Sequence, residues 1–353
     1  MSLNRLVIGM GILGLATASV PAMELVDGFT LSGYGEAFAQ SGHRDRNSWR
    51  NESGSDEWYL HFPSDMAIKV DYRVDEFRFH GDLLAFSQEQ FGNTALLEQA
   101  FVDWRSSSVL TMRAGRFQTT WLGWEGFHTP ELWRVNHSAA WDWNVQNHGL
   151  GPARPFVTDG IGALLSVPDV PFTAQFFIAD DLLGDAPGQK PSDKAVGASF
   201  AYKPKGVGRV ELGLGFDPNS SVTRNGTGSN SFAIDVNADI TAFQDRGWFF
   251  AGEIQVHRHP KLWVAGATWG SDLIALAMAN YAFMPGKASA TLMIDYVERG
   301  FSASNNEVLE IAFAVLTRPH RQVLLNGEVF VWDERAKDAD SVGAAAVVLV
   351  NFP

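Results

Sequence analysis

The sequence predicts an all-β protein: a closed antiparallel transmembrane β-barrel of about sixteen strands with short turns at one rim and long loops at the other. Three observations lead to this prediction. Segments that alternate apolar and polar residues recur along the chain, the connections between them are alternately short and long, and the polar side of the alternation is heavily charged. Together these features are typical of a barrel that turns apolar side chains to lipid and polar ones inward.

The segment 231–242, SFAIDVNADITA, shows the alternation most simply. Every second residue from Phe232 is apolar, and Asp235, Asn237 and Asp239 lie between them. Successive side chains of a strand point to opposite faces, so this segment is predicted to be a two-faced strand. In a soluble sandwich the apolar face would be the core, whereas in a membrane barrel it faces lipid.

Sixteen segments have this character. Each is about 10–12 residues long, which is close to what a tilted strand needs to cross the hydrocarbon layer. The predicted strands are 28–39, 64–74, 76–86, 95–105, 108–117, 159–168, 171–181, 194–204, 208–217, 231–242, 247–257, 272–283, 288–298, 307–317, 321–333 and 341–352.

The connections between these strands alternate in length. Most of the short ones carry Pro, Gly, Asp or Ser, the residues that tight turns need. Short connections are predicted at 73–75, 106–107, 169–170, 204–207, 243–247, 284–287 and 318–320. Long ones are predicted at 40–63, 87–94, 118–158, 182–193, 218–230, 258–271, 299–306 and 334–340. With an even number of strands, this order places both ends of the barrel sequence at the rim of the short turns.

The first 22 residues have the features of a secretory signal peptide. Arg5 is followed by an apolar run over 6–20, and the small residues around Val20-Pro21-Ala22 predict cleavage after Ala22. An N-terminal membrane anchor is the alternative, but the apolar run is short for a span. Residues 23–353 are then predicted to form one barrel, with no helix-forming apolar run long enough to cross a membrane.

Charge and cysteine content narrow the function classes. The formal net charge of −13 argues against nucleic acid as a partner. The sequence has no cysteine, which excludes thiolate metal sites and cysteine nucleophiles. Neither a metal nor a cofactor is therefore expected.

The polar face of the strands is predicted to lie inside the barrel. Unpaired buried charges cost several kcal/mol each, so this face must meet water or a dense network of ion pairs. A barrel of sixteen strands is also too wide for side chains to fill. The residues expected to line the lumen are Glu36, Lys69, Asp71, Arg78, His80, Asp82, Asp103, Arg113, Glu211, Asp235, Asp239, Glu253, His257, Asp295, Glu310 and Glu328.

Large aromatic residues gather on the apolar face near the short turns. Amphipathic rings are most stable at the membrane interface, so these residues predict an aromatic belt. The belt is expected to contain Phe29, Tyr72, Phe77, Trp104, Phe172, Tyr202, Trp248, Phe283 and Phe352.

Several stretches resemble the β-barrel porins of Gram-negative outer membranes. LEQAFVDW at 97–104, a tight turn and LTMRAGRF at 110–117 look like a hairpin of that family, as do TDGIGALLSVP at 158–168 and FTLSGYGEAFA at 29–39. The resemblance implies a non-enzymatic, water-filled channel for small hydrophilic solutes or ions. It also implies an outer-membrane location, contact with membrane lipid and the barrel-assembly machinery, and a homotrimer as one assembly.

The longest connection, 118–158, is expected to fold inward and form the constriction, as the resemblance implies. Acids that face arginines across a narrow point would set a transverse field and a size limit. The expected constriction residues are Trp121, Glu125, Glu131, Arg134, Asp142 and Arg154. The alternative is that the tryptophans of this segment pack it against the barrel wall. The excess of carboxylates on the inner face predicts a mild preference for cations.

Three other hypotheses stay open. An outer-membrane hydrolase would need a nucleophile beside a base, and His80 with Asp82 is the nearest arrangement. A plugged binding barrel would keep the fold without the pore, and a soluble β-sandwich would need no membrane. Weaker candidates are metal ligands at His257 and His259 and calcium ligands at Asp180, Asp181 and Asp185.

Overall fold

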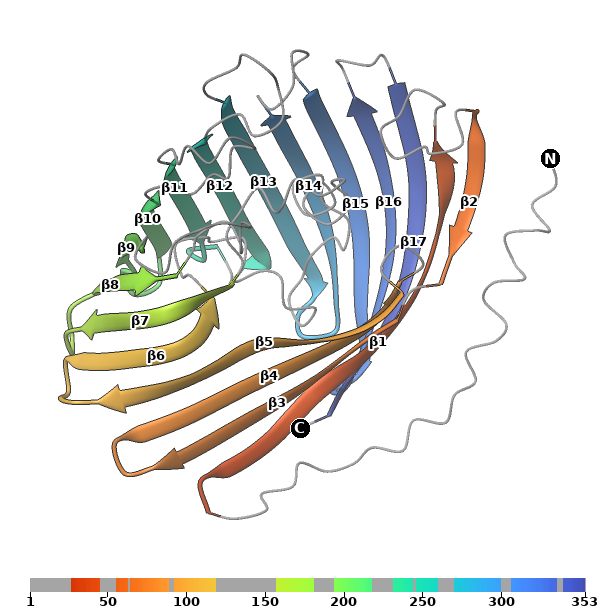
Figure 1. The fold of residues 1–353 in the computed structure, drawn as a ribbon. Helices are drawn as coiled ribbons and strands as arrows, with labels where there is room; N and C mark the ends of the chain where they lie inside the picture. Colours follow the sequence, from red (N-terminus) through yellow and green to blue (C-terminus); the bar gives the residue numbers. More distant parts are fainter. Residues whose placement is uncertain are drawn as a thin grey trace.

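The computed structural model describes residues 27–44, 55–62, 64–88, 92–118, 157–180, 194–217, 231–243, 246–259, 270–299, 306–334 and 339–352. They form one antiparallel sheet of seventeen strands (Figure 1). The strands are β1 (Phe29–Arg44), β2 (Glu57–His61), β3 (Ser64–Val74), β4 (Phe77–Gln88), β5 (Gly92–Arg105), β6 (Leu110–Gln118), β7 (Val157–Ser166), β8 (Phe172–Ala179), β9 (Ala195–Tyr202), β10 (Gly208–Asp217), β11 (Ser231–Ile240), β12 (Trp248–His259), β13 (Gly270–Met284), β14 (Ala288–Arg299), β15 (Asn306–His320), β16 (Val323–Glu334) and β17 (Ala339–Phe352). Within these residues, no helix is long and apolar enough to span a membrane.

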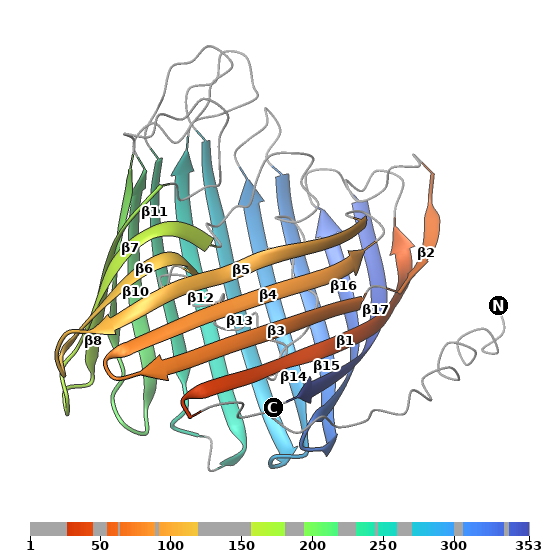
Figure 2. The ribbon, with the colours of Figure 1, turned by 60° about the horizontal axis from the view of Figure 1, so that its bottom comes forward.

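The sheet closes on itself. β1 pairs with β17 along one edge and with β3 along the other, and each strand from β4 to β16 pairs with both of its neighbours in sequence. β2 and β3 lie one after the other along the same edge of β1, so the seventeen strands occupy sixteen positions around the barrel. The predicted all-β barrel of about sixteen strands is confirmed (Figures 1 and 2).

The first long connection differs from its prediction. β1 continues to Arg44, and β2 forms inside the range 40–63 that was predicted as a loop. The residues of the extension, QSGHR, have no apolar alternation, so they gave no strand signal. Their partners decide the structure, because Gly42 pairs with both Gly343 and Tyr59. A Cβ atom at Gly42 would lie 2.3 Å from the Val342 carbonyl oxygen, so only glycine fits this close approach.

The described short turns lie at the rim where β1 begins and β17 ends (Figure 2). Asp75 and Asp169 adopt positive φ angles of 50° and 63° in two of these turns, and Gly206 and Gly286 do so in two others. Gly, Asn and Asp reach this region at the least steric cost, so the turn chemistry read from the sequence is the chemistry that joins these strands.

The outer face of the barrel is apolar. Phe232, Ile234 and Val236 are half exposed, as are their counterparts on the neighbouring strands. Aromatic side chains of this face meet near the short turns: the Phe77 and Trp104 rings stack 6.5 Å apart, and the Trp248 and Tyr281 rings lie 4.6 Å apart. A monomer in water would not expose so continuous an apolar band, whereas a lipid-facing barrel requires one.

On the inner face, the tips of two phenylalanine rings lie over glycines of the adjacent strand. A Cβ atom at Gly343 would lie 2.2 Å from the Phe330 ring, and one at Gly197 would lie 2.1 Å from the Phe177 ring. Both rings are almost fully buried, so neither has free space to move into. The two glycines therefore make room for aromatic packing on the inner wall.

We expect Gly343→Ala to destabilise the barrel. The added methyl group would force the buried Phe330 ring out of place, which should lower the free energy of unfolding by about 1–3 kcal/mol. Urea unfolding of the refolded protein in lipid vesicles would measure the change. Gly327→Ala on β16 is the matched control, since a Cβ atom there meets nothing within 4 Å. Equal stability of the two variants would contradict this account.

Candidate pore lining

Strand pairing places all fourteen charged residues predicted to line the lumen on one face of the sheet. They lie opposite the exposed apolar side chains, on the face that the closed barrel turns inward. These residues are Glu36, Lys69, Asp71, Arg78, Asp82, Asp103, Arg113, Glu211, Asp235, Asp239, Glu253, Asp295, Glu310 and Glu328. His80 lies on the same face, and the side chain of His257 lies outside the described residues.

Three inward-facing cations of β3–β6 lie against carboxylates of neighbouring strands. Arg113 donates two hydrogen bonds to Asp103, at 2.7 and 2.9 Å. Arg78 Nε donates to Asp71 at 2.6 Å, and Lys69 Nζ lies 3.7 Å from Asp82. A two-point contact between a guanidinium and a carboxylate fixes both groups. This part of the wall therefore carries pinned charges of both signs.

An aromatic ring backs these charges. The Arg113 guanidinium carbon lies 3.9 Å from the Phe101 ring centroid, and the Arg78 guanidinium carbon lies 5.8 Å from it. The His80 ring lies 4.8 Å from Phe101 and is within hydrogen-bond distance of Asp71, 3.2 Å from Nδ1 to Oδ2. Cation–π contact and ion pairing act on the same guanidinium groups, which limits their motion. We call Asp71, Arg78, His80, Phe101, Asp103 and Arg113 the β3–β6 cluster.

Arg209 of β10 is an inward-facing cation that the sequence analysis did not select. It donates a hydrogen bond to Asn237 at 2.7 Å and lies 3.4 Å from Glu211 and 3.7 Å from Asp239. It stands two residues before Glu211, so the parity that assigned Glu211 to the inner face also applies to Arg209. The alternation in the sequence was therefore sufficient to predict that Arg209 faces inward.

A row of carboxylates crosses the opposite wall. Glu211 and Glu253 both pair with Asn237, from β10 and β12. Asp295 of β14 and Glu310 of β15 face each other directly in the ladder. All four are almost completely buried, at 0–4% exposure. We call these four residues the buried acid row.

The accessible charges lie elsewhere on the inner face. The side chains of Arg78, Lys69 and Asp71 are 25–33% exposed, and those of Arg209 and Asp239 are 26% and 21% exposed. These five groups carry both signs and belong to β3, β4, β10 and β11. A solute inside the barrel would meet them before it met the buried acid row.

The other hypotheses from the sequence concern a hydrolase site, metal sites, the signal peptide and the constriction, and only some of their residues are described by the structure. His80 hydrogen-bonds with Asp71 rather than with Asp82, the partner considered for a hydrolase. Asp180 forms an ion pair with Lys194, and Asp181 and Asp185 lie outside the described residues. So do the signal peptide and the six constriction residues. In the described part of the chain, no group of three or more His, Asp or Glu side chains could hold a metal ion.

We expect Asp103→Asn to destabilise the barrel by about 3–5 kcal/mol, since it leaves the Arg113 guanidinium buried without its carboxylate. Asp103 is 11% exposed and Arg113 12% exposed, so solvent screens the loss poorly. Urea unfolding in vesicles would measure it. The double variant Asp103→Asn/Arg113→Gln should recover part of the loss. Asp75→Asn is the control, because Asp75 is exposed in a turn whose conformation asparagine also adopts. A loss no larger than the control's would refute the buried-pair account.

No protein-family model matches the sequence, and a comparison with curated proteins found no match. Solved structures do match. They include the outer-membrane channel DcaP of Acinetobacter baumannii, with a TM-score of 0.67, 10% identity, and coverage of 94% of this chain and 100% of that chain. An OmpF of Salmonella typhi in complex with daunomycin matches with a TM-score of 0.64 and 12% identity, over 94% of this chain and 100% of that chain. The anion-selective porin of Comamonas acidovorans matches with a TM-score of 0.62 and 12% identity, over 92% of this chain and 100% of that chain. The chain therefore has the fold of the outer-membrane porins.

Proposed function

We propose that this protein is a passive channel of the Gram-negative outer membrane that lets small hydrophilic solutes or ions diffuse through its barrel. One observation carries the proposal: a closed barrel of sixteen positions turns apolar side chains outward and charged side chains inward. Lipid stabilises the first face, and water in a lumen stabilises the accessible charges of the second. The porin fold of the solved structures supports this assignment.

The segment 118–158 is proposed as the constriction. Gln118 and Val157 are paired in the ladder, so the chain leaves and re-enters the wall at one place. The segment between them carries Trp121, Glu125, Glu131, Arg134, Asp142 and Arg154. A long loop fixed at both ends to one point of a wide barrel can narrow it without altering the strands.

A mild preference for cations is proposed for the pore. With Arg209 added, the predicted lining set contains eleven carboxylates and four cations, namely Lys69, Arg78, Arg113 and Arg209. Pairing within the β3–β6 cluster leaves the carboxylates of β10–β16 in excess. Fixed charge of one sign along a lumen attracts counter-ions and sets selectivity.

Export and assembly complete the proposal. A signal peptide over residues 1–22 would direct the chain through the inner membrane, and the barrel-assembly machinery would insert residues 23–353 into the outer membrane. Surrounding lipid is the direct partner of the outer face. A homotrimer is one assembly consistent with the fold, since a structural neighbour, OmpT of Vibrio cholerae, is described in a trimer form. No cofactor or catalytic step is part of the proposal.

Conductance of refolded 23–353 in a planar bilayer under a salt gradient tests the function directly. Stepwise channels with a cation-selective reversal potential are the expected result. Insertion without conductance would favour the plugged barrel. Hydrolysis of phospholipid or peptide substrates by the refolded protein would favour the enzymatic alternative.

We expect two accessible groups to move the reversal potential in opposite directions. Arg209→Gln removes an inward-facing cation and should increase cation selectivity, whereas Asp239→Asn removes an accessible acid and should decrease it. The measurement is the reversal potential of each variant against the parent. Lys205→Gln, in an exposed turn, is the control. Shifts in the same direction for both variants would contradict the proposed role of these charges.

The absence of cysteine allows a clean test of which inner wall is accessible. We expect Lys69→Cys and Asp239→Cys to react with a charged thiol reagent in the folded barrel. Thr291→Cys and Ser341→Cys should resist it, because these inner-face positions are buried. Mass spectrometry would report the modification and bilayer recording its effect on conductance. Equal reactivity at all four positions would mean an evenly open lumen, and no reaction at any would support a plugged one.

A further inference from the structure

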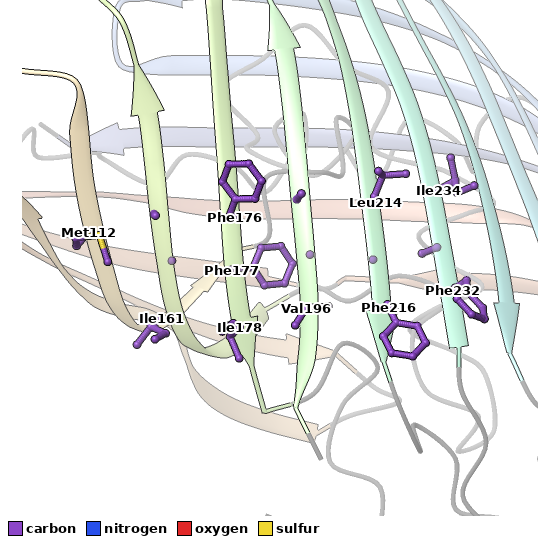
Figure 3. A pocket seen from close by; sticks show the side chains of 16 residues that line it. Met112, Ile161, Phe176, Phe177, Ile178, Val196, Leu214, Phe216, Phe232 and Ile234 are labelled. Carbon is purple, nitrogen blue, oxygen red and sulfur yellow. The ribbon is translucent and has the colours of Figure 1, made fainter. Parts of the chain in front are cut away.

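An apolar groove of about 730 Å³ crosses the outer face of β7–β11 (Figure 3). One side is formed by Phe176, Leu214 and Ile234, and the other by Ile161, Ile178, Val196, Phe216 and Phe232. Outward-facing residues of these strands repeat two positions apart, so the groove runs between two rows of side chains. Its size falls in the range of specific ligand pockets.

Small residues deepen the groove. Ala163 of β7 and Ala198 of β9 flank Phe176 in the ladder, so the first row is interrupted on both sides of that ring. Gly162, Gly197 and Gly215 line the groove between the two rows. Gly197 must be glycine because the Phe177 ring covers it from the other side. A flexible apolar chain could therefore approach the backbone here more closely than a wall of larger side chains would allow.

A row of charged side chains borders the groove at the rim opposite the short turns. Arg116, Asp159, Asp180 and Lys194 follow one another across β6–β9, where these strands meet the long connections. Each of Asp159, Asp180 and Lys194 is two residues from a groove residue, namely Ile161, Ile178 and Val196. Two residues along a strand span about 7 Å, so the charges lie directly beside the groove.

The two cations of this row are open to a ligand. Arg116 Nη1 lies 3.6 Å from Asp159 and Lys194 pairs with Asp180, and all four side chains are 42–62% exposed. Exposed ion pairs of this kind are weak, so a phosphate can compete with the carboxylates for the cations. The rim thus offers Arg116 and Lys194 to an anion at the point where the apolar groove begins.

We propose that this surface binds a phosphorylated, multiply acylated lipid of the outer leaflet. One acyl chain lies in the groove, and a phosphate contacts Arg116 and Lys194. The row as a whole is neutral, with two cations and two carboxylates, so the choice of occupant rests on two features. A phosphate can replace the exposed carboxylates at Arg116 and Lys194, and acyl chains match the apolar groove. The inference rests on the membrane location proposed above and adds a specific lipid site to the general lipid contact of the barrel.

Native mass spectrometry of the refolded barrel in detergent, titrated with bis-phosphorylated hexa-acyl lipid A, tests the site. Arg116→Gln and Lys194→Gln should each weaken binding about fivefold at low salt. Ala198→Phe should weaken it by filling the groove. Ala277→Phe is the matched control, since Ala277 is an outward-facing alanine of β13 outside the groove. Dephosphorylated lipid A should bind more weakly than the phosphorylated form.

Three results would overturn the lipid site. The first is that the Ala198→Phe and Ala277→Phe variants bind lipid A with equal affinity. The second is that phosphorylated and dephosphorylated lipid A bind equally well. The third is that Ala198→Phe changes the number of subunits and leaves the affinity for lipid A unchanged. The last result would assign the groove to a second copy of the chain. None of these substitutions touches the inner face, so conductance separates the two proposals. If the protein forms normal channels but does not bind the lipid, the lipid site is refuted and the channel function stands. If it binds the lipid but forms no channels, the channel function is refuted and the lipid site stands.

Discussion

The pairing of the first strand with the last is the interaction on which the rest of the structure depends. β1 pairs with β17 over twelve residues, from Gly33 opposite Phe352 to Arg44 opposite Ser341. Without this ladder, two strand edges would leave backbone N–H and C=O groups unpaired in hydrocarbon, at a cost of several kcal/mol for each group. The closure explains both the length of β1, which has partners along both of its edges, and the glycine at position 42.

Closure also decides which environment each side of the apolar–polar alternation meets, because it divides one sheet into an outer face and an inner face. The outer face can be uniformly apolar since lipid is its solvent. The inner face has to stabilise charges, and the β3–β6 cluster shows how: Asp103 holds the Arg113 guanidinium at two points while the Phe101 ring lies against it. Neutralisation by a neighbouring strand is available only because the ladder brings these residues face to face.

The sequence predicts the parts of this arrangement that depend on the local pattern of residues, and it misses those that depend on pairing with another strand. The strands at 64–74 and 208–217 have the predicted bounds, because their alternation is strong and turn residues flank them. The end of β1 was missed because its structure depends on β17, about three hundred residues away, and β2 was missed because it forms against that extension of β1. Parity also assigns the lining residues to one face. It cannot predict that Arg78 pairs with Asp71 or that Asp295 is buried, because partner and accessibility depend on neighbouring strands and on the barrel interior.

That difference in accessibility bears on how such a barrel would select solutes. The net charge of −13 suggests a strongly acidic lumen, yet Glu253, Asp295 and Glu310 are nearly inaccessible. Accessible groups include Lys69, Asp71, Arg78, Arg209 and Asp239, and opposite charges lie within 4 Å of each other in the pairs Arg78–Asp71 and Arg209–Asp239. Opposite charges closer than the Debye length largely cancel at a distance and act strongly only at contact. The excess of carboxylates would then give the pore only a mild preference for cations, and local contacts along β3–β4 and β10–β11 would decide how strongly an individual solute is held.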